Sequence, residues 1–226
     1  MKDIIKHYGA KFNFLKSLIK NNTPSILEIG AHYGEDTLRL AQTFPQSTIY
    51  CFEPDPRNIT IFKKHIKEEN IFLFELALSN KDGEADFFLS HQESSEVPSK
   101  YDWISPEDYN NLQLNNSGAS SLKKGYEHAL GSSVTVPTSR FDTWHKTNHL
   151  KEIDFAWIDV QGSEREVIEG MGDKINLIEY IWIEYGEMFY EGAMSKSETI
   201  SLLNCKGFDL IHDQKVSNED LLFIRT

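Results

Sequence analysis

Apolar residues follow two alternating spacings along the chain, which predict strands and helices in turn. Short runs of mostly apolar residues predict strands at 25–29, 48–52, 71–76, 84–89, 134–137, 153–160, 177–185, 208–211 and 221–224. Apolar residues three and four positions apart predict helices at 3–20, 34–44, 56–67, 140–147, 163–170 and 196–205. Several strands are apolar on both faces, so the alternation predicts an α/β fold with a mostly parallel central sheet, helices on both faces and an antiparallel edge strand.

The segment 90–133 interrupts this pattern. It is rich in Ser, Asn, Glu and Tyr, has little periodicity and is too long for an ordinary connection. The chain of 226 residues is a plausible single domain. Within it we expect residues 1–24 to form an N-terminal helical cap and residues 90–133 to form an insertion that covers the substrate.

The stretch "SILEIGAHYGEDTLRLA" at 25–41 predicts a strand, a tight turn and a helix. Gly30 allows the sharp turn, and Gly34 allows close contact at the start of the helix. The spacing differs from the G-x-G-x-x-G fingerprint, in which helix amides bind a pyrophosphate. Glu28 ends the strand, and its carboxylate would repel a pyrophosphate but suit a cationic ligand with an α-amino group.

A second acid, Glu53, ends the next predicted strand. An acid about twenty residues beyond the first turn can bind both hydroxyls of a ribose. A nucleoside with a cationic amino-acid tail and no pyrophosphate is S-adenosylmethionine. Together, Glu28 and Glu53 therefore predict a site for this cofactor.

Three later acids are further candidates for the site. Asp159 and Glu184 close two strands of continuous apolar character, where a buried carboxylate is costly without partners. Ligands bind at the carboxyl ends of parallel strands, so both acids are expected to line the site. Glu164 lies in the first turn of the following helix, where a carboxylate also stabilises a helix N-terminus without any catalytic role.

The charge of the chain narrows the range of partners. The formal net charge is −12 and the pI is about 5.1, so the surface repels phosphate backbones and nucleic acid is disfavoured. The two cysteines, Cys51 and Cys205, imply no disulfide framework. Residues 1–22 match neither a signal peptide nor a membrane span, so we expect a cytoplasmic protein without membrane contact.

Four stretches resemble, in order and spacing, the FkbM-type methyltransferases: "ILEIGAHYGEDT", "CFEPDPRN", "ELALSNKDGEADFF" and "IDFAWIDVQGSEREVIEGM". The resemblance covers roughly residues 25–226 and implies a Rossmann-like methyltransferase fold that uses S-adenosylmethionine. Its most specific part is "IDVQGSE" followed by "VIEGM", where Gln161 replaces the Glu that the family usually carries in D-V-E-G-x-E. The segment 90–133, where substrate choice would lie, matches only loosely, through "GASSL".

The resemblance implies roles for the matching residues. Around the methionine end of the cofactor it implies Glu28, Gly30, His32 and Gly34. Around the nucleoside it implies Glu53 at the ribose, Pro54 in the adjoining turn, Ala77 and Ser79 near the adenine, and Asp159 along the site. The candidates for a base that takes the acceptor's proton are Asp159, Glu184, Glu164 and His32, and the sequence does not choose among them.

Three further features leave alternatives open. His32 could instead be a turn residue bonded to nearby backbone, and Glu75 could lie near the adenine or be a solvated charge at a strand end. No dense ligand motif demands a metal, so we expect none, although Asp159 with Glu184 would suit an oxygen-ligand site. The run at 185–194, "YGEMFYEGAM", is expected to wall the acceptor pocket or to contribute packing.

These observations predict an S-adenosylmethionine-dependent methyltransferase. Its expected reaction is O-methylation of a hydroxyl on a sugar, glycan or small metabolite. One alternative is N-methylation of an amine or peptide, although the N/D-P-P-Y motif typical of amine methylation is absent and "IDVQ" stands in its place. Another is a non-catalytic nucleoside-binding module, which Gln161 leaves open. The missing third glycine and Glu28 argue against a nicotinamide-dependent oxidoreductase, and the sequence indicates no oligomeric state.

Overall fold

The computed structural model describes residues 11–90, 103–109, 117–126, 132–186, 189–213 and 220–226. The predicted helix at 3–20 is therefore described only in part, and residues 11–18 are helical. Much of the predicted insertion at 90–133 lies outside the described residues. In the parts that the structure describes, no helix is both long enough and apolar enough to span a membrane.

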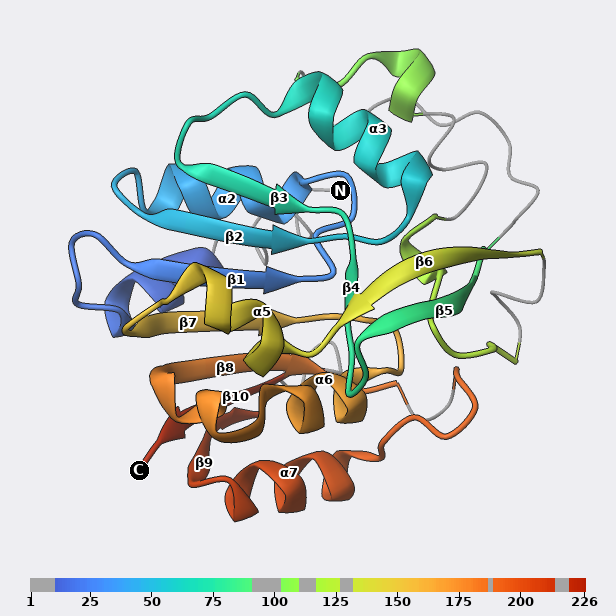
Figure 1. The fold of residues 1–226 in the computed structure, drawn as a ribbon. Coiled ribbons are helices and arrows are strands. Elements are labelled where there is room, and N and C mark those ends of the chain that lie inside the picture. The colour runs from blue at the N-terminus through green and yellow to red at the C-terminus, as the bar shows by residue number, and fades with distance from the viewer. Residues whose placement is uncertain (1–10, 91–102, 110–116, 127–131, 187–188, 214–219) are drawn as a thin grey trace.

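The central sheet has seven strands in the order β3–β2–β1–β7–β8–β10–β9 (Figure 1). In that order they are β3 (Ile71–Phe74), β2 (Thr48–Phe52), β1 (Ser25–Ile29), β7 (Ile153–Ile158), β8 (Ile178–Glu184), β10 (Asp220–Arg225) and β9 (Phe208–Asp213). Neighbouring strands pair in parallel along the row β3, β2, β1, β7 and β8, and β10 is antiparallel to both of its neighbours. The predicted α/β fold is therefore confirmed.

The antiparallel strand lies one position in from the edge of the sheet. Strand β10 fits there because Leu221, Leu222 and Phe223 are all fully buried, as a strand paired on both sides requires. Strand β9 takes the edge, and its Ile211 leaves 43% of its surface exposed.

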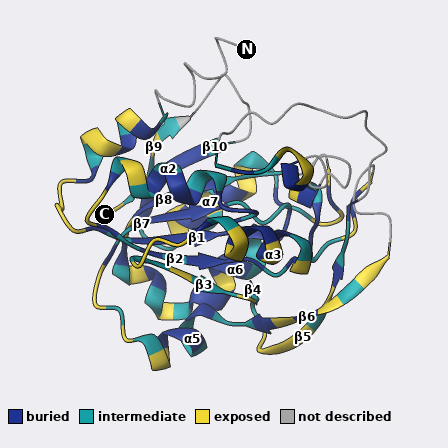
Figure 2. Cartoon of the chain, turned by 90° about the horizontal axis from the view of Figure 1, so that it is seen from above, coloured by how far each residue is buried: buried dark blue, intermediate teal, exposed yellow. Residues whose placement is uncertain are grey.

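Helices cover both faces of this sheet, as the alternating pattern predicts. They are α2 (Glu35–Thr43), α3 (Pro56–His65), α5 (Phe141–Asn148), α6 (Glu164–Met171) and α7 (Lys196–Cys205). One hydrophobic core joins the sheet to α5, α6 and α7, and the other joins it to α2, α3 and residues 11–18. Successive residues of β1 alternate between them, since Leu27 and Ile29 belong to the first core and Ile26 to the second. The strands between the two cores are the most buried part of the chain (Figure 2).

The start of α3 follows its sequence signals closely. Asp55 caps the helix by accepting a hydrogen bond from the Arg57 amide at 2.9 Å, and Pro56 takes the first helical position. The stretch "EPDPRN" carries both of these helix-start signals.

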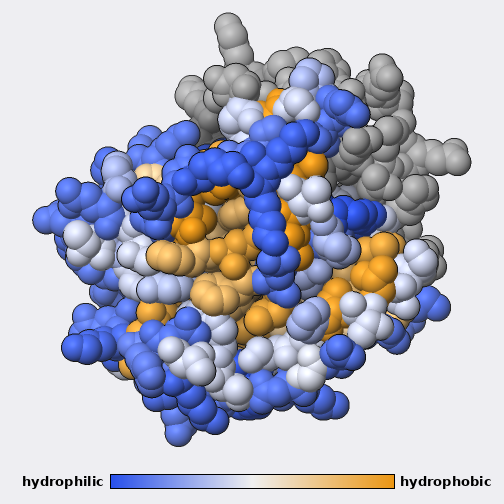
Figure 3. Space-filling model, turned by 45° about the horizontal axis from the view of Figure 1, so that its top comes forward, coloured by the Kyte–Doolittle hydropathy of each residue, from blue (hydrophilic) through white to orange (hydrophobic). Residues whose placement is uncertain are grey.

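A second sheet lies beyond the carboxyl ends of β1 and β2 (Figure 1). It has the order β4–β6–β5, formed by β4 (Ala77–Leu78), β6 (Ser133–Ser139) and β5 (Gly83–Phe88). The predicted strand at 71–76 ends early, at Phe74, because the chain leaves the central sheet and pairs Ala77 and Leu78 with β6. Figure 3 shows a face of the molecule on which hydrophobic residues gather in a central area crossed by hydrophilic ones.

Candidate functional site

A cavity of about 320 Å³ opens at the carboxyl ends of β1, β2 and β7. Its volume is in the range of small-molecule sites, and its position is where parallel α/β sheets bind ligands. Its walls include the turn after β1, the end of β2, the second sheet, the segment 117–122 and the exit of β7. Among the lining residues are Glu28, Gly30, His32, Glu53, Pro54, Ala77, Leu78, Asp159 and Gln161.

The turn after β1 brings the backbone of two strands together. Gly30 has φ 91°, and a Cβ there would lie 1.8 Å from the carbonyl oxygen of Asp159. The amides of Gly30 and Ala31 donate to the carbonyl of Phe52 at 2.9 and 3.0 Å, which ties the turn to the end of β2. Gly34 has φ 95° and caps α2, where a Cβ would lie 1.9 Å from Cδ1 of Ile66. The turn is therefore as tight as the sequence predicts.

Glu28 lines the cavity from the end of β1 and is only 2% exposed. Its Oε2 accepts a hydrogen bond from Oγ1 of Thr37 at 2.5 Å and one from Sγ of Cys51 at 3.4 Å. Burial raises the pKa of the Glu28 carboxyl well above its usual range. A bound ammonium group would favour the ionised form of this carboxyl. The role of Glu28 at the amino-acid end of a ligand remains a prediction.

Glu53 lines the cavity from the end of β2 and is 4% exposed. Its Oε2 accepts from the His32 amide at 2.7 Å, and its Oε1 accepts from the Asp55 amide at 2.8 Å and from Nδ2 of Asn58 at 3.3 Å. Burial raises the pKa of Glu53 to about 7, against the lowering effect of these donors and of His32. A carboxylate offers about four acceptor positions, so Oε2 keeps one for a ligand hydroxyl.

We expect Glu53→Ala to weaken binding of S-adenosylhomocysteine about 10- to 100-fold. The substitution removes a charged acceptor, worth about 1.5–3 kcal/mol, and leaves two turn amides without it. Calorimetric titration checks this. Glu75→Ala is the matched control, because Glu75 directly follows the neighbouring strand β3 but is half exposed, pairs with Lys63 and is not among the lining residues. Equal affinity in both variants would remove Glu53 from the site.

His32 occupies the turn with φ 52°. Its Nδ1 lies 3.0 Å from Oε1 of Glu35 and its Nε2 lies 2.8 Å from Oγ of Ser117. Burial alone would lower the pKa of His32, but the carboxylates of Glu35, Glu53 and Asp159 raise it above its usual value. His32 therefore lines the cavity, and its ring is held by two side chains rather than by nearby backbone, while its role toward a ligand remains a prediction.

The other predicted nucleoside contacts divide in two. Pro54 and Ala77 line the cavity. Ser79 is not among the lining residues: its amide donates to the carbonyl of Ser139 at 2.9 Å, and its own carbonyl lies against Gly170. Its proposed place near the adenine remains a prediction.

A second cavity of about 330 Å³ adjoins the first. Aromatic side chains, glycines and carboxylates line it: Gly118, Ala119, Gln161, Gly162, Glu164, Glu184, Tyr185, Gly186, Phe189 and Tyr190. The structure thus brings Tyr185, Phe189 and Tyr190 of the run 185–194 to a cavity wall. Gly118 and Gln161 line both cavities.

Asp159 and Glu184 meet at the boundary between the cavities. Asp159 follows β7 and lines the first cavity, and Glu184 ends β8 and lines the second. Nε2 of Gln161 donates to both, at 2.6 Å to Oδ1 of Asp159 and 2.9 Å to Oε2 of Glu184. Burial, followed by the neighbouring Asp159 carboxylate, raises the pKa of Glu184 well above its usual range. The two carboxyl groups are thus held beside one another by a single amide.

Glu164 is 1% exposed and holds the turn before α6. Its Oε1 accepts from the amides of Gly162 at 3.0 Å and Val160 at 3.3 Å, and its buried Oε2 has no hydrogen-bond partner within the described residues. Burial raises the pKa of Glu164 to about 7, despite these amides. Glu164 thus combines the structural role weighed from the sequence with a place in the second cavity.

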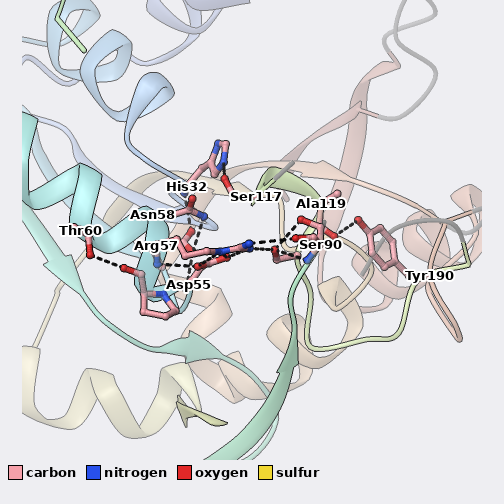
Figure 4. A network of polar contacts seen from close by, with 12 residues as sticks. His32, Asp55, Arg57, Asn58, Thr60, Ser90, Ser117, Ala119 and Tyr190 are labelled. Atoms are coloured by element: carbon pink, nitrogen blue, oxygen red, sulfur yellow. Dashed lines mark hydrogen bonds and ion pairs between the residues drawn. The ribbon is translucent and has the colours of Figure 1, made fainter. Parts of the chain in front are cut away.

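The segment 117–121 crosses between the two cavities and is fixed by side chains from distant parts of the chain (Figure 4). Its contacts are Ser117 with His32 at 2.8 Å, Ser120 with Arg57 at 2.8 Å, the Ala119 carbonyl with the Tyr190 hydroxyl at 2.9 Å, and Ser121 with the Gln161 carbonyl at 2.5 Å. Sequence analysis missed Ser117 and Arg57, and it included Tyr190 only as part of the run 185–194. The "GASSL" match is the one sequence signal that points to this segment.

Among the residues that the structure describes, no group of three or more His, Cys, Asp or Glu side chains is arranged to hold a metal ion. The oxygen-ligand site considered for Asp159 and Glu184 has Gln161 at its centre, and the amide of Gln161 turns donors toward both acids. An amide hydrogen in that position occupies the place that a cation would need.

Curated proteins and solved structures resemble this chain over most of its length. A 2-O-methyltransferase, NoeI, from Sinorhizobium fredii is 29% identical over 204 residues, covering 86% of this chain and 76% of its own. Methyltransferase 1 from Beauveria bassiana is 25% identical over 188 residues, covering 81% and 71%. A putative rRNA-methylase from Clostridium thermocellum has a TM-score of 0.52 at 10% identity, with 96% of this chain and 94% of that chain covered. A putative caffeoyl-CoA O-methyltransferase from Staphylococcus aureus has a TM-score of 0.51 at 10% identity, with 96% and 83% covered.

At 10% identity the two solved structures share only the fold with this chain. The family is assigned by a match to a family model. The first cavity fits S-adenosylmethionine, because its glycine turn admits a ligand to the backbone, Glu53 offers an acceptor position, and Ala77 and Leu78 add an apolar wall. The model described as the methyltransferase FkbM domain matches residues 28–210. The predicted fold, family and cofactor are thus confirmed: the chain belongs to the FkbM family of S-adenosylmethionine-dependent methyltransferases.

Proposed function

We propose that this enzyme methylates a hydroxyl group of an uncharged sugar, glycan or small metabolite bound in the second cavity. The observation that carries the proposal is the junction of the two cavities, where Gln161 lines both and holds Asp159 and Glu184 beside the path between them. A 2-O-methyltransferase among the relatives supports an oxygen acceptor.

The junction suits the chemistry of transfer to oxygen. Bound S-adenosylmethionine supplies a methyl group on a positively charged sulfur, and transfer is an in-line displacement for which alignment contributes much of the rate. A hydroxyl gains nucleophilicity when a base within hydrogen-bond reach accepts its proton. Asp159 and Glu184 are the two acids placed at the junction to accept that proton.

The lining of the second cavity favours a polyhydroxyl compound over an amine. Aliphatic amines are protonated at neutral pH, and the carboxylates of Glu164 and Glu184 would stabilise the ammonium form, which has no lone pair to accept a methyl group. Hydroxyls, in contrast, donate hydrogen bonds to carboxylates without charge. Tyr185, Phe189 and Tyr190 add flat apolar surface of the kind that sugar rings contact.

The acidic lining also predicts a preference by charge. We expect a neutral glycoside to be methylated at a hydroxyl, and its 6-phosphate and uronate counterparts to have kcat/KM values lower by about tenfold or more, because Glu164, with a pKa of about 7, is partly ionised at neutral pH and would repel them. Initial rates with methyl-labelled cofactor check this, and NMR of the product identifies the methylated atom. Raising the ionic strength should narrow the difference.

Amino-sugar counterparts of the same glycosides complete the panel. Methylation at nitrogen in preference to oxygen would replace the proposal by the amine alternative. Tight binding of S-adenosylhomocysteine without transfer to any member would leave the non-catalytic nucleoside-binding module as the better interpretation.

A further inference from the structure

Gln161 has an unusually restricted position between the two cavities. Its backbone adopts φ 55°, a left-handed conformation that costs a non-glycine residue energy and therefore needs support from its surroundings. The hydroxyl of Ser121 donates to its carbonyl at 2.5 Å, which ties this turn to the segment 117–121. Gln161 is thus fixed in the wall that separates cofactor from acceptor.

The side-chain amide of Gln161 is fully used. An amide has two N–H donors, and these point to Asp159 at 2.6 Å and Glu184 at 2.9 Å. Its Oε1 lies 2.7 Å from the Tyr190 hydroxyl and shares the single hydrogen of that hydroxyl with the Ala119 carbonyl, which lies 2.9 Å from it. Turning the amide over would set its oxygen against two carboxyl groups, so the acids and Tyr190 together fix its orientation.

We propose that Gln161 is the positioning residue for proton acceptance: its two N–H groups hold Asp159 and Glu184 together at the boundary of the cavities and set how readily the pair takes up a proton. The expected effect of Gln161 on methyl transfer rests on the proposed function. The pairing of Asp159 and Glu184 by its amide does not. The amide replaces a proton or a cation as the group that allows two carboxyl groups to lie side by side.

The direction of the expected pKa change follows from the effect of a donated hydrogen bond on a carboxyl group. N–H donors stabilise an ionised carboxylate, so removing them raises the pKa of the pair. Other groups act on the same pair and stay in place when Gln161 is changed. They are Glu164 on α6, Asp220 on β10, His32 after β1, and Tyr190.

The first test is Gln161→Met, which keeps the length of the side chain and removes both donors. In protein with ¹³C-labelled Asp and Glu carboxyls, NMR titration should show the pair titrating about one pH unit or more higher than in the wild type. Loss of resonances in Asp159→Asn and Glu184→Gln assigns the signals. With an acceptor, kcat should fall about 10- to 100-fold, the acid limb of the pH profile should move to higher pH, and S-adenosylhomocysteine affinity should change less than about threefold.

The second test is Gln161→Glu, which keeps the shape and replaces both donors by an acceptor. It should move the titration and the acid limb further in the same direction, and the exposed substitution Gln46→Glu is its control for added charge. Both variants could instead titrate like the wild type and keep the acid limb of the pH profile in place. That result, even with lowered thermal stability, would show that Gln161 is only a packing residue. If no acceptor is turned over while the carboxyl titrations shift as expected, the pairing stands and the proposed O-methylation falls.

Discussion

Glu184→Gln is expected to lower the turnover number for methyl transfer by about 10²- to 10⁴-fold, the range for loss of a general base. The amide cannot take up a proton, whereas its oxygen still accepts the Gln161 donor that Glu184 accepts at 2.9 Å, so the fold should persist. Asp159→Asn should act in the same direction, because both acids bind the same Gln161 amide at the junction of the cavities. Steady-state rates and S-adenosylhomocysteine affinity, measured on the same preparations, separate turnover from cofactor binding.

Glu179→Gln is the matched control for this experiment. Glu179 belongs to the same strand, β8, but its side chain is exposed and it is not among the lining residues of either cavity. Its rate should stay within twofold or so of the wild type, as is usual for surface substitutions. If Glu184→Gln and Asp159→Asn both keep full activity, the base must be sought at Glu164 or His32.

The position of the candidate site follows from strand ends, which the sequence marks clearly. Glu28, Glu53, Asp159 and Glu184 each end or follow an apolar run, and in a parallel sheet all such ends meet at one edge. The structure brings them there, on β1, β2, β7 and β8. Periodicity and turn chemistry therefore determine the place of the site because both are local properties of the chain.

The contacts that shape the site could not be predicted in the same way. The bond between His32 and Ser117 spans 85 residues, and the contact between Tyr190 and Ala119 spans 71. No spacing rule relates side chains so far apart. The second sheet escaped prediction for a similar reason, since β4 has only two residues and exists because it pairs with the distant β6.

Gln161 shows most directly what the sequence alone could not predict. In the sequence it is a departure from the usual Glu of the family, which could mean a decayed site. In the structure it donates to both neighbouring acids and contacts Tyr190. The same substitution therefore has the opposite interpretation once its three partners are known.

Gly30→Ala is expected to be the most destabilising single-atom change at this edge of the sheet, with a loss of more than about 4 kcal/mol in the free energy of unfolding. The new Cβ would lie 1.8 Å from the Asp159 carbonyl oxygen. Neither backbone can move away freely, because the Asp159 amide donates to the Ile29 carbonyl at 3.0 Å and β1 pairs with β7 along its length. Urea unfolding measures the loss, and S-adenosylhomocysteine binding should fall with it.

Gly207→Ala separates the two causes of that loss. Gly207 has φ 82°, close to the 91° of Gly30, but among the described residues no atom outside its two chain neighbours lies within 4 Å of the position of its Cβ. Its substitution should therefore cost only the backbone strain, about 1–2 kcal/mol. The difference between the two variants measures how closely the turn after β1 contacts the exit of β7. Equal losses would mean that this contact is looser than the structure has it, and that Asp159 does not reach the cofactor cavity by the close approach of these two strands.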